Sequence, residues 1–165
     1  DWIKSMAMRK WEERKVVLSL YGSGTDKGAI RELIGFMEVQ NVCLRGQVRS
    51  YQDIWAENEL LVMPSRYEGM SLALLESMWC GRPSVVAATG GGACEVVEDG
   101  KSGFIAEAPT VKLFDAAMER AWKSRALWPE MGKCAREIGE ERIPADPSAV
   151  FAETIESLML YVTGS

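Results

Sequence analysis

Two carboxylates and a glycine turn lie within residues 64–83, the part of the sequence best suited to chemistry. This segment, PSRYEGMSLALLESMWCGRP, leaves a predicted strand and enters a predicted helix. Gly69 lets the backbone approach a ligand closely, and Ser71 can cap the helix with its side chain. The backbone amides of residues 69–72 would then point outward at a helix N-terminus. Such a row of N–H groups binds anions, and a diphosphate would fit it.

Glu68 and Glu76 stand on either side of this turn. Glu68 lies just before the predicted helix, and Glu76 lies five residues after Ser71, roughly 7–8 Å along the helix axis. A carboxylate accepts hydrogen bonds well from neighbouring hydroxyl groups of a sugar. Amides for phosphate, with one carboxylate for a sugar and one for a ribose, describe a nucleotide-sugar site. The plainer interpretation is an exposed loop glutamate and a surface glutamate on an amphipathic helix.

Two other glycine-containing segments match known nucleotide motifs only in part. In the turn at residues 22–28 the third glycine comes one residue too late for dinucleotide binding. The next strand ends in Leu-Arg-Gly at 44–46, without the acidic residue that holds a ribose, which argues against NAD. Residues 22–28 therefore form either a simple tight turn or a ligand-facing one. Gly-Lys-Ser at 100–102 lacks the first glycine of a P-loop and precedes a strand, which indicates a turn.

Composition excludes several classes of function. The chain has 165 residues and no histidine, so a Ser-His-Asp triad and a histidine zinc site cannot form within it. Its net charge of −5 disfavours general nucleic-acid binding. The four cysteines follow no metal-binding spacing and are expected to be reduced, as in the cytosol. The sequence shows no signal peptide and no apolar run of the roughly 20 residues that a membrane-spanning helix needs.

Helical and strand patterns alternate along the chain with short connections. Near-continuous apolar strands between helices indicate a doubly wound, Rossmann-like parallel sheet with helices on both faces, which binds ligands beyond the carboxyl ends of its strands. The charged residues 12–15 are expected to form a solvated helix end. Strands are predicted over 15–21, 41–46, 59–64, 83–88 and 102–108, and helices over 1–14, 26–39, 50–57, 71–80, 93–98, 110–124, 126–142 and 147–162.

The spacing Glu68-x7-Glu76, within P-S-x-x-E-G and L-E-x-M-x-x-G-x-P, resembles the E-x7-E signature of family 4 glycosyltransferases of the GT-B fold. LYGSG at 20–24 resembles that family's strand with a Gly-x-Gly turn, and NVCLRGQV at 41–48 resembles its next strand. VVAATGGGACEVVEDGKSGFIAEAP at 85–109 is similar to a further glycine-rich passage of the family. The resemblance extends over roughly residues 15–140.

The resemblance implies a role for each matching residue. Glu68 would be the catalytic residue, contacting hydroxyls of the donor sugar, and Glu76 would hold the ribose hydroxyls. Val48 would lie against the nucleobase, and Gly22 would line the floor of the cleft. Backbone amides for the sugar and the diphosphate would come from Gly69, Met70, Ser71 and Leu72.

The resemblance also implies the setting of these residues. Residues 1–165 would be a single, N-terminally truncated domain, the C-terminal donor-binding half of a two-domain enzyme, with 147–162 as its last helix. The enzyme would transfer a hexose from a nucleoside diphosphate sugar to a carbohydrate or lipid-linked glycan, retaining configuration and using no metal or other cofactor. Its partners would be the donor and an N-terminal acceptor domain. It would be cytoplasmic, with the inner face of the cell membrane as an optional site of peripheral association.

Three departures and two alternatives accompany this resemblance. The family's Arg and Lys, which neutralise the leaving diphosphate, and its acceptor half have no counterpart here, so this chain by itself is expected to be inactive. Met70 stands where the family often has Phe. A sugar-nucleotide epimerase of the same architecture is one alternative. A non-catalytic nucleotide-sugar-binding module is the other.

Overall fold

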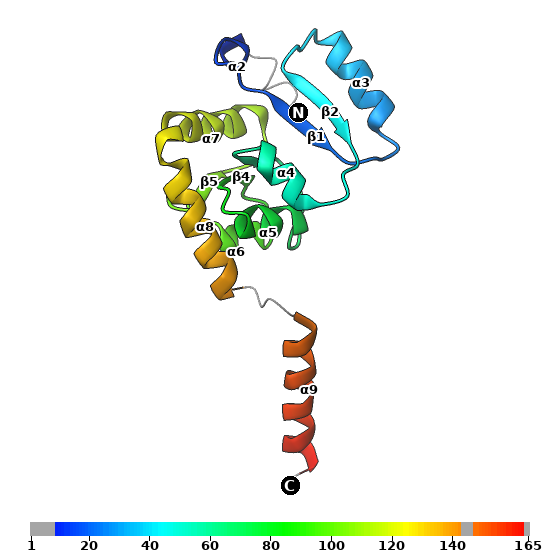
Figure 1. Cartoon of the computed structure of the whole chain (residues 1–165), viewed down its shortest axis with the longest axis vertical. Helices are drawn as coiled ribbons and strands as arrows, with labels where there is room; N and C mark the ends of the chain where they lie inside the picture. Colours follow the sequence, from blue (N-terminus) through cyan, green and yellow to red (C-terminus); the bar gives the residue numbers. More distant parts are fainter. Residues whose placement is uncertain (1–8, 143–146, 164–165) are drawn as a thin grey trace.

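A computed structural model describes residues 9–142 and 147–163 (Figure 1). Every strand and helix predicted after residue 14 is present, and the predicted helix over 1–14 is described from Arg9 onward. In chain order the elements are α2 (Arg9–Glu13), β1 (Leu18–Tyr21), α3 (Lys27–Phe36), β2 (Val42–Gly46), α4 (Tyr51–Glu57), β3 (Leu61–Met63), α5 (Leu72–Trp79), β4 (Ser84–Ala87), α6 (Ala93–Val96), β5 (Gly103–Ala106), α7 (Val111–Lys123), the 3₁₀ turn η1 (Arg125–Leu127), α8 (Trp128–Arg142) and α9 (Pro147–Thr163).

All strand pairs in the described residues are parallel, and helices cover both faces, which confirms the predicted α/β class. Leu18 pairs with Val42 at the start of the β1–β2 ladder, and Leu61 pairs with Ser84 at the start of the β3–β4 ladder. The hydrogen bonds form two sheets rather than one continuous sheet. Their strand orders are β1-β2 and β3-β4-β5.

Strand β4 is buried on both faces. Because successive side chains of a strand point to opposite sides, its residues contribute to two different apolar clusters. Val85 belongs to the apolar cluster that includes Phe114 of α7. Val86 belongs to a second cluster with Leu74 of α5 and Ala135 of α8. Both valines are 0% exposed. The apolar run in the sequence therefore reflects a strand between two helical layers, as predicted.

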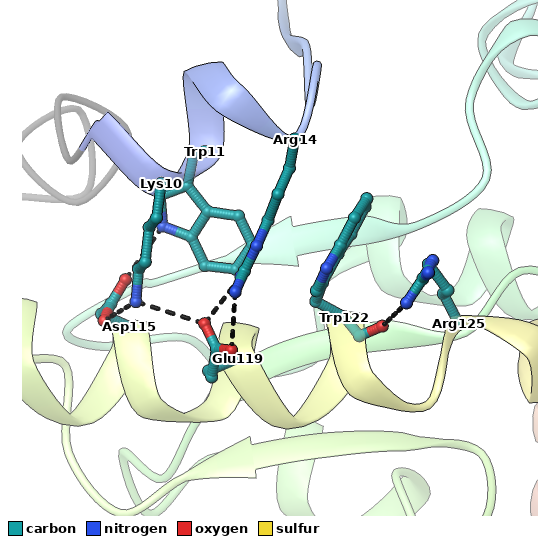
Figure 2. A network of polar contacts seen from close by, with 7 residues as sticks. All are labelled: Lys10, Trp11, Arg14, Asp115, Glu119, Trp122 and Arg125. Atoms are coloured by element: carbon teal, nitrogen blue, oxygen red, sulfur yellow. Dashed lines mark hydrogen bonds and ion pairs between the residues drawn. The ribbon is translucent and has the colours of Figure 1, made fainter.

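Helix α2 is attached to α7 by a network of charged groups and a tryptophan (Figure 2). Arg14 donates two hydrogen bonds to the carboxylate of Glu119, at 2.7 and 2.9 Å. Lys10 forms an ion pair with Asp115 at 2.6 Å, and the indole Nε1 of Trp11 donates to the same carboxylate at 2.9 Å. The solvated helix end predicted for residues 12–15 is wrong for Arg14, because the fold brings an acidic face of α7 beside it.

The aromatic part of this network is edge-to-face packing. The rings of Trp11 and Trp122 are 6.4 Å apart with an interplanar angle of 87°. The guanidinium of Arg14 lies 4.9 Å from the Trp11 ring centroid, and that of Arg125 lies 4.6 Å from the Trp122 ring centroid. Trp11 is only 1% exposed. It is therefore a core residue, which joins α2 to the rest of the molecule.

Helix α9 carries exposed apolar side chains. Phe151, Leu158 and Met159 are 67%, 59% and 62% exposed. In Figure 1 this helix (red) lies away from the sheets and their covering helices. Of the helices in the described part of the chain, none is long and apolar enough to cross a lipid bilayer.

Replacing Trp11 by alanine should destabilise the protein by about 3–5 kcal/mol, because a buried aromatic side chain and its indole hydrogen bond are lost together. Urea unfolding followed by circular dichroism measures this. Phe36→Ala is the matched control, since Phe36 is 87% exposed, and it should change the free energy of unfolding by no more than about 0.5 kcal/mol. Equal effects of the two variants would show that α2 is not part of the core.

The Arg14–Glu119 pair should make stability depend on acid pH. The hydrogen bonds from Arg14 lower the pKa of Glu119 from 4.5 to about 2. A carboxyl group whose pKa is lowered by folding stabilises the folded state at pH values above its ordinary pKa. For Glu119 this stabilisation is lost as the pH falls from 4.5 toward 2. Urea unfolding of the wild type and Glu119→Gln should therefore show a stability difference that narrows over this range. A difference independent of pH would contradict the assigned pKa.

Candidate functional site

The turn after β3 lies directly against the turn after β4. The N–H of Gly92 donates to the carbonyl of Gly69 at 2.7 Å. A Cβ on Gly91 would lie 1.7 Å from the carbonyl oxygen of Glu68, and a Cβ on Gly92 would lie 2.8 Å from that of Gly69. Both positions therefore require glycine. No role was predicted for Gly91 or Gly92, although the run of glycines at 90–92 is a signal for a close approach of two backbones.

Helix α5 starts with unused backbone donors. Ser71 is the N-cap residue, and its carbonyl accepts from the N–H groups of Leu74 and Leu75. Its side chain makes no cap hydrogen bond and is buried, so the predicted side-chain cap is wrong. Within the described residues no hydrogen bond involves the backbone N–H groups of residues 69–72. The side chains of Met70 and Leu72 are exposed beside these groups.

Glu76 lies in the wall of a cavity of about 860 Å³ between the two sheets. Ala73 of the same helix, Tyr21 of β1 and Met63 of β3 line that cavity with it. Burial raises the pKa of Glu76 above its ordinary value. Of the residues in the turn before α5, 68–72, none lines this cavity in the described structure. The structure therefore places Glu68 and Glu76 at the same helix but not in one cavity.

Gly22 and Val48 lie beyond the carboxyl ends of β1 and β2. Gly22 has φ +118° and Gly46 has φ +76°, a backbone conformation that favours glycine. The N–H of Gly22 donates to the carbonyl of Gly46 at 2.7 Å, which holds the two strand ends together. Val48 follows two residues later and is 39% exposed. These two predicted site residues thus follow paired strands at the same end of the sheet.

The arrangement suits the binding of an anion that carries hydroxyl groups. Unused N–H groups at a helix N-terminus attract negative charge, and flanking carboxylates accept hydrogen bonds from hydroxyls. Glu68 is half-buried in the loop before α5. Glu76 is also half-buried and lies within α5, more than one helical turn further along. Among the described residues, no group of three or more Asp, Glu or Cys side chains is placed to hold a metal ion.

Known proteins of similar sequence are glycosyltransferases. The chain is 28% identical over 127 residues to a poly(ribitol-phosphate) alpha-N-acetylglucosaminyltransferase of Staphylococcus aureus, covering 76% of this chain and 26% of that protein. It is 29% identical over 140 residues to an N-acetyl-alpha-D-glucosaminyl L-malate synthase of Bacillus anthracis, covering 84% of this chain and 36% of the relative. The chain therefore spans about a quarter to a third of the length of these relatives.

Solved structures of other proteins share this fold. The crystal structure of TarM matches with a TM-score of 0.81 at 24% identity, covering 93% of this chain and 31% of TarM. Anabaena HepE in complex with UDP matches with a TM-score of 0.76 at 21% identity, covering 96% of this chain and 44% of HepE. The family model described as "Glycosyl transferases group 1" matches residues 2–124. The chain therefore belongs to the group 1 glycosyltransferases.

Proposed function

We propose that the chain is the C-terminal, donor-binding domain of a retaining family 4 glycosyltransferase. The full enzyme transfers a hexose from a nucleoside diphosphate sugar to a carbohydrate or lipid-linked glycan acceptor. One observation carries this proposal: within the described part of the chain the N–H groups of residues 69–72 make no hydrogen bond, and they lie at the start of α5 in the turn that follows the parallel strand β3. Such a position beyond the carboxyl end of a strand is where α/β sheets bind phosphorylated ligands.

The donor diphosphate binds to these N–H groups in the proposed complex. Glu68 accepts hydrogen bonds from hydroxyls of the donor sugar, and Glu76 accepts them from the ribose. Gly22 and Val48 lie on the nucleobase side. The glycine pair 91–92 supports the turn from behind, since the Gly92 N–H holds the Gly69 carbonyl at 2.7 Å. This contact gives the turn a fixed shape before the donor arrives.

Two physical effects account for the contribution of this domain to transfer. Negative charge develops on the diphosphate as its bond to the sugar breaks, and N–H groups already aimed at that position stabilise it. Glu68 holds the sugar in an orientation that the acceptor can attack, which is a proximity effect. No residue of this chain is assigned as a nucleophile.

UDP-sugars are the proposed donors, and the remainder of the enzyme is the proposed acceptor domain. The HepE structure of similar fold contains UDP, which supports a uridine nucleotide. The matched relatives are much longer than this chain, which supports an additional N-terminal domain that binds the acceptor. The four cysteines are free, which fits a reducing compartment such as the cytoplasm, with the inner membrane face as the place where a lipid-linked acceptor is met.

Calorimetric titration with UDP-glucose and UDP-N-acetylglucosamine tests the proposal. Glu76→Gln should weaken binding roughly 10- to 100-fold, because a charge-assisted hydrogen bond to the ribose is lost. Burial raises the pKa of Glu76, so wild-type affinity should begin to fall at a higher pH than the ordinary glutamate pKa of 4.5 would give, while Glu76→Gln should show no such fall. Glu130→Gln, an exposed glutamate on α8, is the matched control and should bind as the wild type does.

If the wild type and Glu76→Gln bound both donors with equal affinity, the assignment of Glu76 to the donor site would be wrong. Absence of donor binding in the full-length enzyme would overturn the proposed function as a whole.

Gly91→Ala should reduce UDP-glucose affinity by more than about ten-fold, since the added methyl group would overlap the Glu68 carbonyl and displace the turn before α5. Gly35→Ala is the matched control, because no atom lies within 4 Å of a Cβ at that position in α3. Circular dichroism shows whether each variant keeps its fold. A folded Gly91→Ala protein with wild-type affinity would show that the turn does not bind the donor.

A further inference from the structure

The serine at the start of α5 has the position of a helix cap but not its hydrogen bond. Ser71 is the N-cap residue of this helix, and it is only 8% exposed. In the described residues no hydrogen bond involves its hydroxyl group. Buried polar groups are almost always bonded in folded proteins, because an unpaired group has lost its contacts with water. The free protein therefore gains nothing from this hydroxyl.

The usual partner of such a hydroxyl is also without a bond. A serine at the N-cap normally accepts a hydrogen bond from the N–H of the second or third residue of the helix. In α5 these residues are Ala73 and Leu74. The N–H of Leu74 donates to the Ser71 carbonyl at 3.1 Å, whereas no hydrogen bond within the described part of the chain involves the N–H of Ala73. Two groups that could bond to each other are thus both unpaired.

Helices α4 and α7 of the same chain have ordinary caps. Ser50 precedes α4, and its Oγ accepts from the N–H of Gln52, the second residue of that helix, at 3.2 Å. Thr110 precedes α7, and its Oγ1 accepts from the N–H of Leu113 at 3.4 Å. The backbone of Ser71 has φ −79° and ψ 123°, within the extended region that N-cap residues adopt. The backbone conformation therefore does not account for the missing cap of α5.

The Ser71 hydroxyl lies beside other groups that a ligand can reach. Among the described residues, the fully enclosed side-chain donor without a partner is the indole Nε1 of Trp55, so the Ser71 hydroxyl keeps access to the surface. Ala73 is exposed. Side chains tilt toward the N-terminus of a helix, which places this hydroxyl on the same side as the unbonded N–H groups of residues 69–72. A ligand at the start of α5 can therefore contact the hydroxyl and the N–H groups together.

An anionic oxygen is the ligand that fits these groups best. A hydroxyl and a backbone N–H can both donate, so one acceptor placed between them satisfies both. The start of a helix carries partial positive charge, which favours a negatively charged acceptor. Hydrogen bonds to an ionised acceptor are also about twice as strong as those between neutral groups. A phosphate oxygen meets all three conditions, whereas a neutral sugar hydroxyl meets only the first.

We propose that the Ser71 hydroxyl is a side-chain ligand of the donor diphosphate. It donates a hydrogen bond to one phosphate oxygen, and the same oxygen accepts from the N–H of Ala73. The phosphate oxygen thus joins the two groups that the cap of α4 joins directly. This inference rests on the proposed donor site, to which it adds a contact from a side chain. A backbone N–H cannot be removed by a simple substitution, whereas the hydroxyl of Ser71 can.

Titration of the full-length enzyme with UDP, followed by calorimetry, and with uridine, followed by NMR, tests this inference. Ser71→Ala should weaken UDP binding roughly ten-fold or more, because a charge-assisted hydrogen bond is lost. Uridine has no phosphate, so it should bind the wild type and the variant equally. Ser71→Gly removes the same hydroxyl and should give the same two results.

Thr110→Ala is the matched control, because it removes a cap that is formed in the free protein. Its midpoint of thermal unfolding should fall by about 2–4 °C, while its UDP affinity stays at the wild-type value. Without nucleotide, Ser71→Ala should lower the midpoint by no more than about 1 °C, since no hydrogen bond is lost from the free protein. The two variants therefore separate helix capping from ligand binding.

Four results would contradict the inference. If the wild type bound UDP and Ser71→Ala bound it equally well, the hydroxyl contact would be wrong and the proposed function would stand. A matching loss of uridine affinity, or a fall in the midpoint like that of Thr110→Ala, would give Ser71 a structural role. A loss with UDP-glucose but not with UDP would place the hydroxyl against the sugar. If the wild type did not bind UDP, the donor site and this inference would both be wrong.

Discussion

Pairing of β4 on both of its edges is the constraint on which the functional site depends. Because β4 lies between β3 and β5, its alternate side chains must be buried in two different apolar clusters, with α7 on one face and α5 and α8 on the other. The same ladder fixes the turns that follow β3 and β4 beside each other. The contact of Gly91 and Gly92 with the backbone of Glu68 and Gly69 follows from that register.

Charge placement has a different role at α2 and at the start of α5. Near the chain start, Lys10 and Arg14 meet Asp115 and Glu119, which attaches α2 to α7 and brings β1 close to the larger sheet. At the start of α5 the favourable partial charge comes from the backbone, since the N–H groups there have no partner among the residues that the structure describes. The charged groups of α2 are paired within the protein. In the proposed function, the N–H groups at the start of α5 are paired by the donor diphosphate.

Local sequence patterns predicted the helices and strands correctly. They were less successful in predicting the burial and the hydrogen-bond partners of individual side chains. The apolar runs placed β1, β2 and β4 correctly, and the helix predicted over 71–80 is α5, which contains Glu76 and begins after Glu68. The Ser71 cap was predicted wrongly, because the side chain is buried where a typical cap would turn back over the helix. Arg14 was expected to be solvated, and no local pattern could reveal an acidic partner 105 residues away.

The sequence by itself determined the class of fold, the order of strands and helices, and the candidate residues of the proposed nucleotide-sugar site. These properties depend on periodicity and on short-range spacing, which a linear chain displays directly. Only the tertiary structure decided which backbone groups remain without partners. In the described residues, the N–H groups at 69–72 and the indole of Trp55 are left without partners, and this depends on contacts between distant segments. Hydrogen bonding between such segments is set by packing in three dimensions, and no local pattern encodes it.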